Sequence, residues 1–214
     1  LAFPSPFAIL SDENINKLLG LFADITELKK YPLAQDDTEL VNKIDELFYE
    51  AFSLTSEERI LIEDTIKFDM DLFYKEKNSM ALRRVLTDEA TLYAEGLSKE
   101  LNAFMDGQLS VSMTIYEANA GDALRMVVLK FGEESTISIE KVDSINIALK
   151  NLDPGLIGRK SDHLYVQKIL MYYDADTVTL VKPNSMRYWT RTQALDDAAV
   201  IFSDILNMEG DNAE

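Results

Sequence analysis

The sequence contains no cysteine and only one histidine, His163, among its 214 residues. Without cysteine the chain cannot form disulfides, use a thiol nucleophile, or build cysteine-ligated zinc and iron–sulfur sites. One histidine cannot supply a multi-histidine metal site by itself. We therefore expect neither a resident metal nor a cofactor, and the lack of cysteine agrees with a reducing cytoplasm.

Two kinds of targeting segment are also missing. No apolar run reaches the roughly 18 residues of a membrane-spanning helix, and no basic segment followed by an apolar one opens the chain. We expect a cytoplasmic protein without membrane contact. The chain begins with Leu1 rather than Met, and its opening, LAFPSPFAIL, is apolar and interrupted by proline. This opening favours a piece of a longer polypeptide.

Positive charge is scarce, because 21 Lys and Arg residues face 38 Asp and Glu residues, for a net charge of -17. Such a charge repels duplex DNA at long range, so the whole chain is not expected to bind nucleic acid nonspecifically. The deficit is uneven. Residues 141–195 carry 8 Lys and Arg against 5 Asp and Glu, whereas residues 1–140 carry 13 against 27. Any contact with a polyanion is predicted in the middle block.

The first 78 residues show helical periodicity. Apolar residues at helical spacing predict a helix over residues 11–31 and a second helix after the polar turn at residues 35–37, joined as an antiparallel hairpin. Thr55 and Glu58 form a capping-box pair that predicts the start of a third helix. Its apolar side is expected to contain Ile62, Ile66, Met70 and Phe73. We predict a helical region over residues 1–78, ending at a polar break.

From residue 79 the pattern becomes mixed. A longer helix is predicted from Met80 to about residue 106, followed by LSVSMTIY, which alternates apolar and polar residues as a half-buried strand does. LRMVVLKF and TISIEKV predict two more strands, expected to form a meander with the first. After a helix over VDSINIALKNL, two further strands and a final helix are predicted. The fold class is α+β, with an antiparallel sheet of about five strands flanked by helices over residues 79–214.

The segment KPNSMRYWTRTQALDD, residues 182–197, joins a predicted strand to the last helix. The only tryptophan, Trp189, lies between Arg187 and Arg191, and Thr190 with Gln193 forms a second capping-box pair. Because free N–H groups and the helix dipole both favour an anion at a helix N-terminus, the segment fits a phosphate site. It fits equally a buried tryptophan that fills the corner between sheet and helix, with the arginines paired to nearby acids.

The candidate nucleic-acid-binding residues are cations of the middle block and this corner. They would position a phosphate backbone or an acidic partner rather than read bases. Asp174 and Asp176 are interpreted as turn formers rather than as a divalent-cation site, and no catalytic residue is predicted. The predicted binding site consists of Arg159, Lys160, Lys182, Arg187 and Arg191.

The segment NKIDELFYEAFSLTSEERILIE, residues 42–63, resembles a helical segment near the C-terminal end of bacterial N6-adenine DNA methyltransferases and of related single-chain restriction-modification enzymes. The chain departs from the family pattern at Phe48 and Ala51, which keep apolar character, and at Ser53, where the family often has glycine. A vaguer likeness, over residues 178–198, is to the end of accessory C-terminal domains in large restriction or phage-defence proteins. The matching residues of the first segment are Ile44, Asp45, Leu47, Tyr49, Phe52, Leu54, Thr55, Glu57 and Glu58.

The family's catalytic Asn/Asp-Pro-Pro-Tyr/Phe motif and its glycine-containing cofactor loop do not occur in this sequence. The resemblance therefore implies a non-catalytic C-terminal accessory region that assists DNA engagement or contacts between domains. Its expected partners are the remainder of the parent polypeptide or its complex, and the DNA backbone. The alternative is a protein-interaction module of a bacterial defence complex without direct DNA contact, in which the Trp189 corner is only core.

Overall fold

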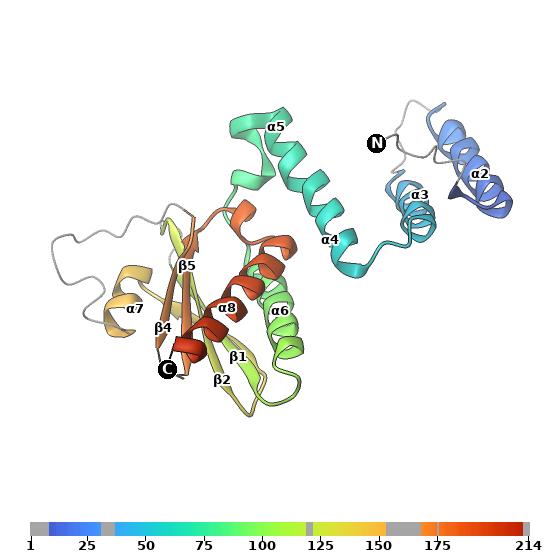
Figure 1. Ribbon diagram of the computed structural model, residues 1–214. Coiled ribbons are helices and arrows are strands. Elements are labelled where there is room, and N and C mark those ends of the chain that lie inside the picture. The colour runs from blue at the N-terminus through green and yellow to red at the C-terminus, as the bar shows by residue number, and fades with distance from the viewer. Residues whose placement is uncertain (1–8, 31–36, 119–121, 153–167, 175, 212–214) are drawn as a thin grey trace. The chain divides into compact units, whose positions relative to one another are not determined.

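The computed structural model describes residues 9–30, 37–118, 122–152, 168–174 and 176–211 (Figure 1). Contacts divide the chain into two compact units, Leu1–Arg59 and Ile60–Glu214. This division falls earlier than the break after Asn78 that we predicted from the sequence. Phe68, which precedes that break, belongs to the core of the second unit.

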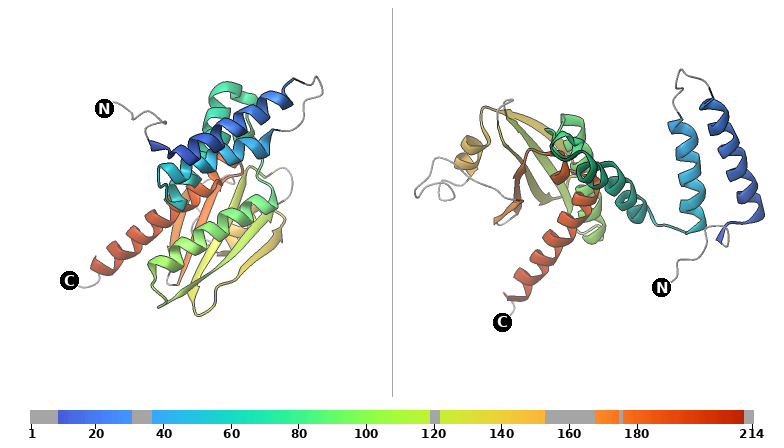
Figure 2. Two further views of the ribbon diagram at one scale, coloured as in Figure 1. Left: turned by 90° about the vertical axis from the view of Figure 1, so that its right-hand side faces the viewer. Right: turned by 90° about the horizontal axis from the view of Figure 1, so that it is seen from above.

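The first unit is a helical hairpin. Helices α2 (Asp12–Leu28) and α3 (Thr38–Ala51) lie side by side and antiparallel, as the sequence predicts (Figure 2). Ser11 begins α2, because its hydroxyl oxygen accepts a hydrogen bond from the backbone N–H of Asn14 at 3.2 Å. Such caps satisfy one of the free donors of a first helical turn.

The core of this hairpin is thin. Among its described residues only three apolar side chains are buried, namely those of Leu10, Leu18 and Tyr49. Leu19 and Phe22, which the helical spacing also placed on the apolar stripe, are 59% and 51% exposed. Small units bury too little apolar surface to be stable without added support. Much of the apolar face of the hairpin is therefore open to solvent.

A long helical segment begins at the boundary of the two units. It consists of α4 (Ser56–Asp64), the π-helix η1 (Thr65–Met70) and α5 (Asp71–Lys75). The predicted capping box is confirmed at its start. The N–H of Thr55 donates to Glu58 at 2.9 Å, and the N–H of Glu58 donates to the Thr55 hydroxyl oxygen at 3.3 Å.

The π-helical turn changes which side of this segment packs inward. Phe68 is buried, whereas Ile66, Met70 and Phe73 are 57%, 44% and 78% exposed. A π-helix holds more residues per turn than the 3.6-residue period on which the predicted apolar side was based. The side predicted to be apolar is therefore the one that faces solvent here.

The segment ends at Glu76, whose φ of 47° interrupts the helix. Two short 3-10 helices follow, η2 (Glu76–Asn78) and η3 (Met80–Leu82). The Asp71 carboxylate accepts hydrogen bonds from the Ser79 hydroxyl at 2.7 Å and the Met80 N–H at 2.8 Å. The Lys75 side chain, together with these two donors, lowers the pKa of Asp71 to about 2. Asp71 thus fixes the turn that leaves the helix.

The second unit contains a five-stranded sheet in the order β3-β1-β2-β5-β4 (Figure 1). The pairs β1/β2, β2/β5 and β4/β5 are antiparallel, and β1/β3 is parallel. The α+β class and the number of strands are confirmed, and the sheet is mixed rather than wholly antiparallel. The strands are β1 (Ser110–Ala118), β2 (Leu124–Gly132), β3 (Ile137–Val142), β4 (Leu170–Asp174) and β5 (Thr177–Pro183).

The predicted meander of the first three strands is wrong. After β2 the chain passes the start of β1 and runs along the far edge of β1, where Ile137 pairs with Met113 and Val142 with Ala118. The reason is that the other edge of β2 is occupied by β5. The connection after β2 reverses the chain direction once more. A third strand on the free edge of β1 must then run parallel to β1. Alternation within one strand does not carry this information.

Helices cover both faces of the sheet (Figure 2). Helices α6 (Thr87–Phe104) and α8 (Arg191–Asp211) pack on the face that presents Val127 and Leu129 of β2. Helix α7 (Ile145–Leu152) packs on the opposite face, against Met126 of β2. Alternate side chains of β2 therefore belong to two hydrophobic cores, one on each face of the sheet.

Helices α6 and α8 approach closely at Gly96, where an added Cβ would lie 3.4 Å from the Cβ of Ala194. A glycine facing an alanine permits this close packing. No helix in the described part of the chain is long and apolar enough to cross a membrane.

Candidate functional site

The predicted corner begins with Trp189, which follows the short helix η4 (Met186–Tyr188). Its side chain is 1% exposed, and its indole N–H donates to the carbonyl oxygen of Pro183 at 2.9 Å. Its ring meets that of Tyr93 on α6 edge-on, with centroids 5.0 Å apart. Trp189 therefore fills the corner between the sheet and helices α6 and α8, as one of the two interpretations predicted.

Lys182, a predicted phosphate-binding residue, lies in the core. It is 1% exposed and forms an ion pair with Asp197 of α8. Its ammonium nitrogen lies 4.6 Å from the centre of the Tyr93 ring and 5.5 Å from that of Trp189. Burial lowers the pKa of Lys182, and the charge of Asp197 opposes that change. In this structure Lys182 is not accessible to a phosphate, which corrects its assignment to a nucleic-acid site.

The N-terminus of α8 already holds an anion that belongs to the chain. The Asp64 carboxylate accepts hydrogen bonds from the N–H of Thr192 at 2.7 Å and from its hydroxyl at 2.9 Å. Arg191 donates to Glu63 at 2.6 Å and lies 3.6 Å from Asp64. The sequence correctly identified an anion-binding helix end, but an internal carboxylate occupies it.

The capping box at this end is only half formed. The hydroxyl oxygen of Thr190 accepts a hydrogen bond from the N–H of Gln193 at 3.2 Å. The Gln193 side chain donates instead to Asp196 at 3.2 Å. The backbone donors of Gln193 and Thr192 in this turn are therefore satisfied by the Thr190 hydroxyl and by the Asp64 carboxylate.

The remaining predicted cations do not gather into a site. Arg187 is exposed, stacks over the Tyr188 ring at 4.6 Å and donates to the Tyr188 hydroxyl. Arg159 and Lys160 lie outside the described residues, as does His163. Of the predicted site, only Arg187 is an exposed cation without an ion pair in the described part of the chain.

Removing the Asp64 carboxylate is expected to destabilise the chain and to open this helix end to external anions. Asp64→Ala should lower the free energy of unfolding by about 1–3 kcal/mol, because it leaves buried donors without a charged acceptor. Inorganic sulfate should then stabilise the variant more than the wild type, since an anion that binds only the folded state raises stability. Urea unfolding at several sulfate concentrations measures both effects. An equal gain in the two proteins, as general salting-out produces, would contradict the expectation.

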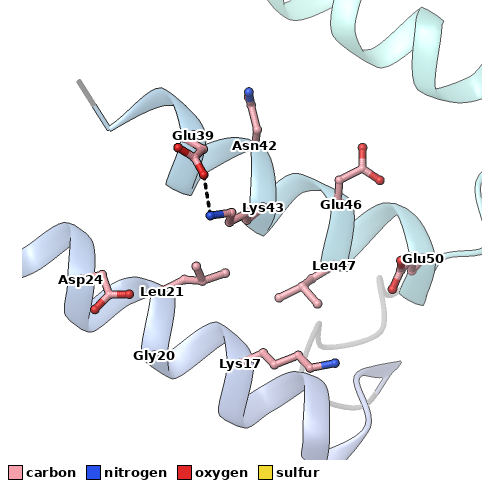
Figure 3. Close-up of a pocket in the computed structure, with 10 residues that line it drawn as sticks. All are labelled: Lys17, Gly20, Leu21, Asp24, Glu39, Asn42, Lys43, Glu46, Leu47 and Glu50. Carbon is pink, nitrogen blue, oxygen red and sulfur yellow. Dashed lines mark hydrogen bonds and ion pairs between the residues drawn. The ribbon is translucent and has the colours of Figure 1, made fainter.

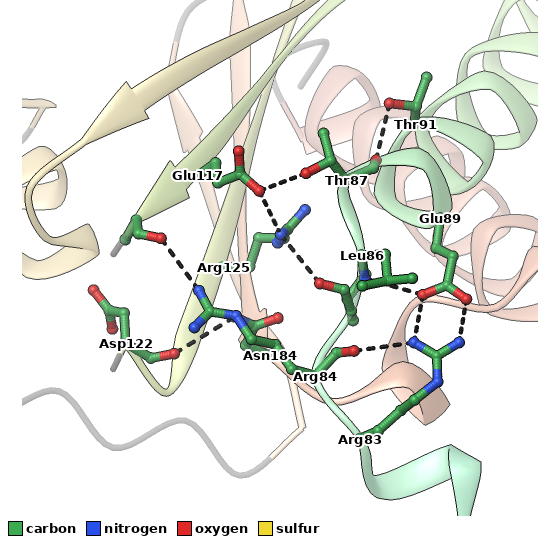
Figure 4. Close-up of polar contacts among 12 residues, drawn as sticks. Arg83, Arg84, Leu86, Thr87, Glu89, Thr91, Glu117, Asp122, Arg125 and Asn184 are labelled. Carbon is green, nitrogen blue, oxygen red and sulfur yellow. Dashed lines mark hydrogen bonds and ion pairs between the residues drawn. The ribbon is translucent and has the colours of Figure 1, made fainter. Parts of the chain in front are cut away.

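A second polar cluster, not foreseen from the sequence, joins the segment before α6 to the end of β1 and β2 (Figure 4). Arg125 is 2% exposed and donates to the carbonyl oxygen of Val85 and to Glu117, both at 3.3 Å. Glu117 also accepts from the Thr87 hydroxyl at 2.6 Å, which lowers the pKa of Glu117. The available signal was a cation, Arg125, near the start of a strand whose next four residues are apolar.

Further bonds of this cluster fix the same connection (Figure 4). Arg83 donates to Glu89 at 2.8 Å, and Arg84 donates to the carbonyl oxygen of Ala118 at 3.2 Å. One guanidinium nitrogen of Arg125 and the amide oxygen of Asn184 are buried without a hydrogen-bond partner. The cluster pairs cations with carboxylates and carbonyl oxygens across the end of the sheet. These bonds hold the segment before α6 against the end of the sheet.

The described residues also contain open cavities. A groove of about 560 Å³ lies between α2 and α3 (Figure 3). Another hollow, of about 660 Å³, lies among Met105, Phe131, Tyr173, Ile205 and neighbouring residues. No group of three or more His, Asp or Glu side chains that could hold a metal occurs within the described ranges. Asp174 and Asp176 lie at the β4–β5 turn, as predicted.

Protein-family models, curated proteins and solved structures were each compared with the chain, and none of the three comparisons gave a match.

Proposed function

We propose that the chain is a non-catalytic accessory part of a bacterial DNA methyltransferase or restriction-modification protein of the cytoplasm, and that it acts through protein contacts. The resemblance of residues 42–63 to that family supports the first half of the proposal. The way the charges are used argues against direct contact with DNA. Lys182 and Arg191 are paired with carboxylates, and the net charge of -17 repels a DNA backbone.

The exposed apolar segment α4–η1–α5 is the single feature on which the choice of protein contacts depends. Ile66, Met70, Phe73 and Tyr74 are 57%, 44%, 78% and 72% exposed within nine residues. Isolated exposed apolar side chains are normal, but a group of large ones is typical of a surface that another protein covers. The rings of Phe73 and Tyr74 also meet edge-on, with centroids 5.2 Å apart.

The test is size-exclusion chromatography of this chain with the methylating domain of the polypeptide that contains it or works with it. We expect a complex that survives nuclease treatment and that Ile66→Asp/Phe73→Asp abolishes. Leu92→Asp/Ile147→Asp is the matched control, because Leu92 and Ile147 are also exposed, at 55% and 53%, on α6 and α7. A complex that forms only with DNA present would instead support direct engagement of DNA phosphates, for which Arg187 remains the exposed candidate.

A further inference from the structure

The groove between α2 and α3 has the features of a helix-binding site. Leu21 of α2 and Leu47 of α3 line it from opposite sides, with Gly20 beside Leu21 (Figure 3). The described part of the hairpin buries few of its own apolar residues, and a third helix against the groove would complete a small helical core. The groove runs between two antiparallel helices, which suits an added helix.

Gly20 indicates how closely that helix approaches. It lies inside α2, where glycine costs about 1 kcal/mol relative to alanine. No contact in the described part of the chain requires this glycine, since an added Cβ at Gly20 would have nothing within 4 Å and its φ is ordinary. A glycine on an open groove allows another backbone to approach closely, and helix axes come nearest where the contacting side chains are smallest.

The charges at the groove select the chemistry of the partner. Four carboxylates and two lysines line it. Lys17 pairs with Glu13 and Lys43 with Glu39, both at 2.7 Å, and Glu46 pairs with Arg59 at 3.0 Å. Asp24 has no ion-pair partner among the described residues, and Glu50 influences Lys17 only at longer range. Acidic edges around an apolar floor complement a helix with leucine-like residues on one side and cations beside them.

These charges also argue against a second copy of the chain as the occupant. Two such grooves facing each other would place the same carboxylates together, and like charges opposed across an interface disfavour the pairing. We infer that the α2–α3 groove binds a cationic amphipathic helix of a partner protein, which packs its small or apolar side over Gly20 between Leu21 and Leu47. This inference deepens the proposed protein-binding role and rests on it.

The probe is a fluorescein-labelled synthetic helix of about 18 residues with leucine on one side and lysine elsewhere, measured by fluorescence anisotropy with the full chain. The same peptide with glutamate in place of lysine is the charge control. We expect the lysine peptide to bind and the glutamate peptide to bind at least about tenfold more weakly, with binding that weakens as salt rises.

Two pairs of variants locate the binding. Gly20→Trp places a bulky side chain in the groove, at a position where an added Cβ meets nothing within 4 Å, and should weaken binding about tenfold or more. Leu19→Trp is the control and should not weaken binding, because Leu19 is 59% exposed and outside the groove lining. Asp24→Asn/Glu50→Gln should weaken binding several-fold and reduce its salt dependence. Glu95→Gln/Glu140→Gln makes the same charge change on α6 and β3 and should leave binding unchanged. Circular dichroism confirms that each variant is folded.

Other outcomes overturn the inference. Equal binding of both peptides, equal effects of Gly20→Trp and Leu19→Trp, no binding at low salt, or self-association through the groove in sedimentation would each do so. If the lysine peptide does not bind but the complex with the methylating domain forms and is lost in the Phe73 variant, only the assignment of the groove is wrong. If the peptide binds but that complex does not form, the groove assignment stands and the proposed parent protein is wrong.

Discussion

Asp197→Ala is expected to lower the free energy of unfolding by about 3–5 kcal/mol, the usual cost of removing one partner of a buried ion pair. The substitution leaves the Lys182 ammonium without its carboxylate in a site that is 1% exposed. It also removes the acceptor of the Tyr93 hydroxyl, which donates to Asp197 at 2.5 Å. Urea unfolding of the full chain, followed by circular dichroism, measures the loss.

The loss in Asp197→Ala should shrink as pH rises. Without Asp197 the burial that lowers the pKa of Lys182 is unopposed. The unfolded state then binds more protons than the folded state between the two pKa values, so stability increases with pH across that range. The control is Lys182→Met/Asp197→Leu/Tyr93→Phe, which replaces the polar group by apolar side chains and should recover most of the stability. A loss below about 1 kcal/mol in Asp197→Ala would show that water reaches this site.

Trp189→Ala is expected to cost about 3–5 kcal/mol, because truncation of a buried aromatic side chain leaves a cavity. The indole lies against Tyr93 and beside the Lys182 ammonium, so the cavity would open where sheet, α6 and α8 meet. Far-ultraviolet circular dichroism in urea is the suitable measurement, since the variant has no tryptophan fluorescence.

Trp189→Phe separates the two contributions of this side chain. It keeps most of the apolar volume and loses the hydrogen bond to Pro183, which is typically worth about 1 kcal/mol. We therefore expect a loss well below that of Trp189→Ala. Leu206→Ala, at a position on α8 that is 51% exposed, should have little effect. Equal losses in the two Trp189 variants would indicate that the hydrogen bond, not packing, holds the corner.

The periodicity of the sequence predicted the fold class, the helical hairpin and five strands, because those features depend on local alternation. Strand order depends on which edge is free when β3 and β5 join the sheet, and this is not encoded in either strand alone. The packing side of α8 depends on small residues as well as large ones. Ala194, Ala198 and Ile201 are buried, whereas Leu206 is half exposed, because Gly96 lets α6 approach α8 at Ala194.

The candidate phosphate site shows a different limit of sequence reasoning. Cations next to a helix N-terminus were recognised correctly, but their partners are distant in the chain. Asp64 accepts a hydrogen bond from Thr192, and Lys182 of β5 pairs with Asp197 of α8. The composition favours such internal ion pairs, because 38 Asp and Glu residues compete for 21 Lys and Arg residues. In a strongly acidic chain, clustered Lys and Arg side chains more readily form ion pairs with carboxylates of the same chain.

The bonds from Glu63 and Asp64 to Arg191 and Thr192 join residues that are 128 positions apart. During synthesis at roughly 5–20 residues per second, the start of the second unit therefore waits for several seconds or more before its partners are made. Over that interval the hairpin of the first unit can already form, because its contacts are local. The order of synthesis thus makes the groove between α2 and α3 available to a partner helix before the sheet is complete.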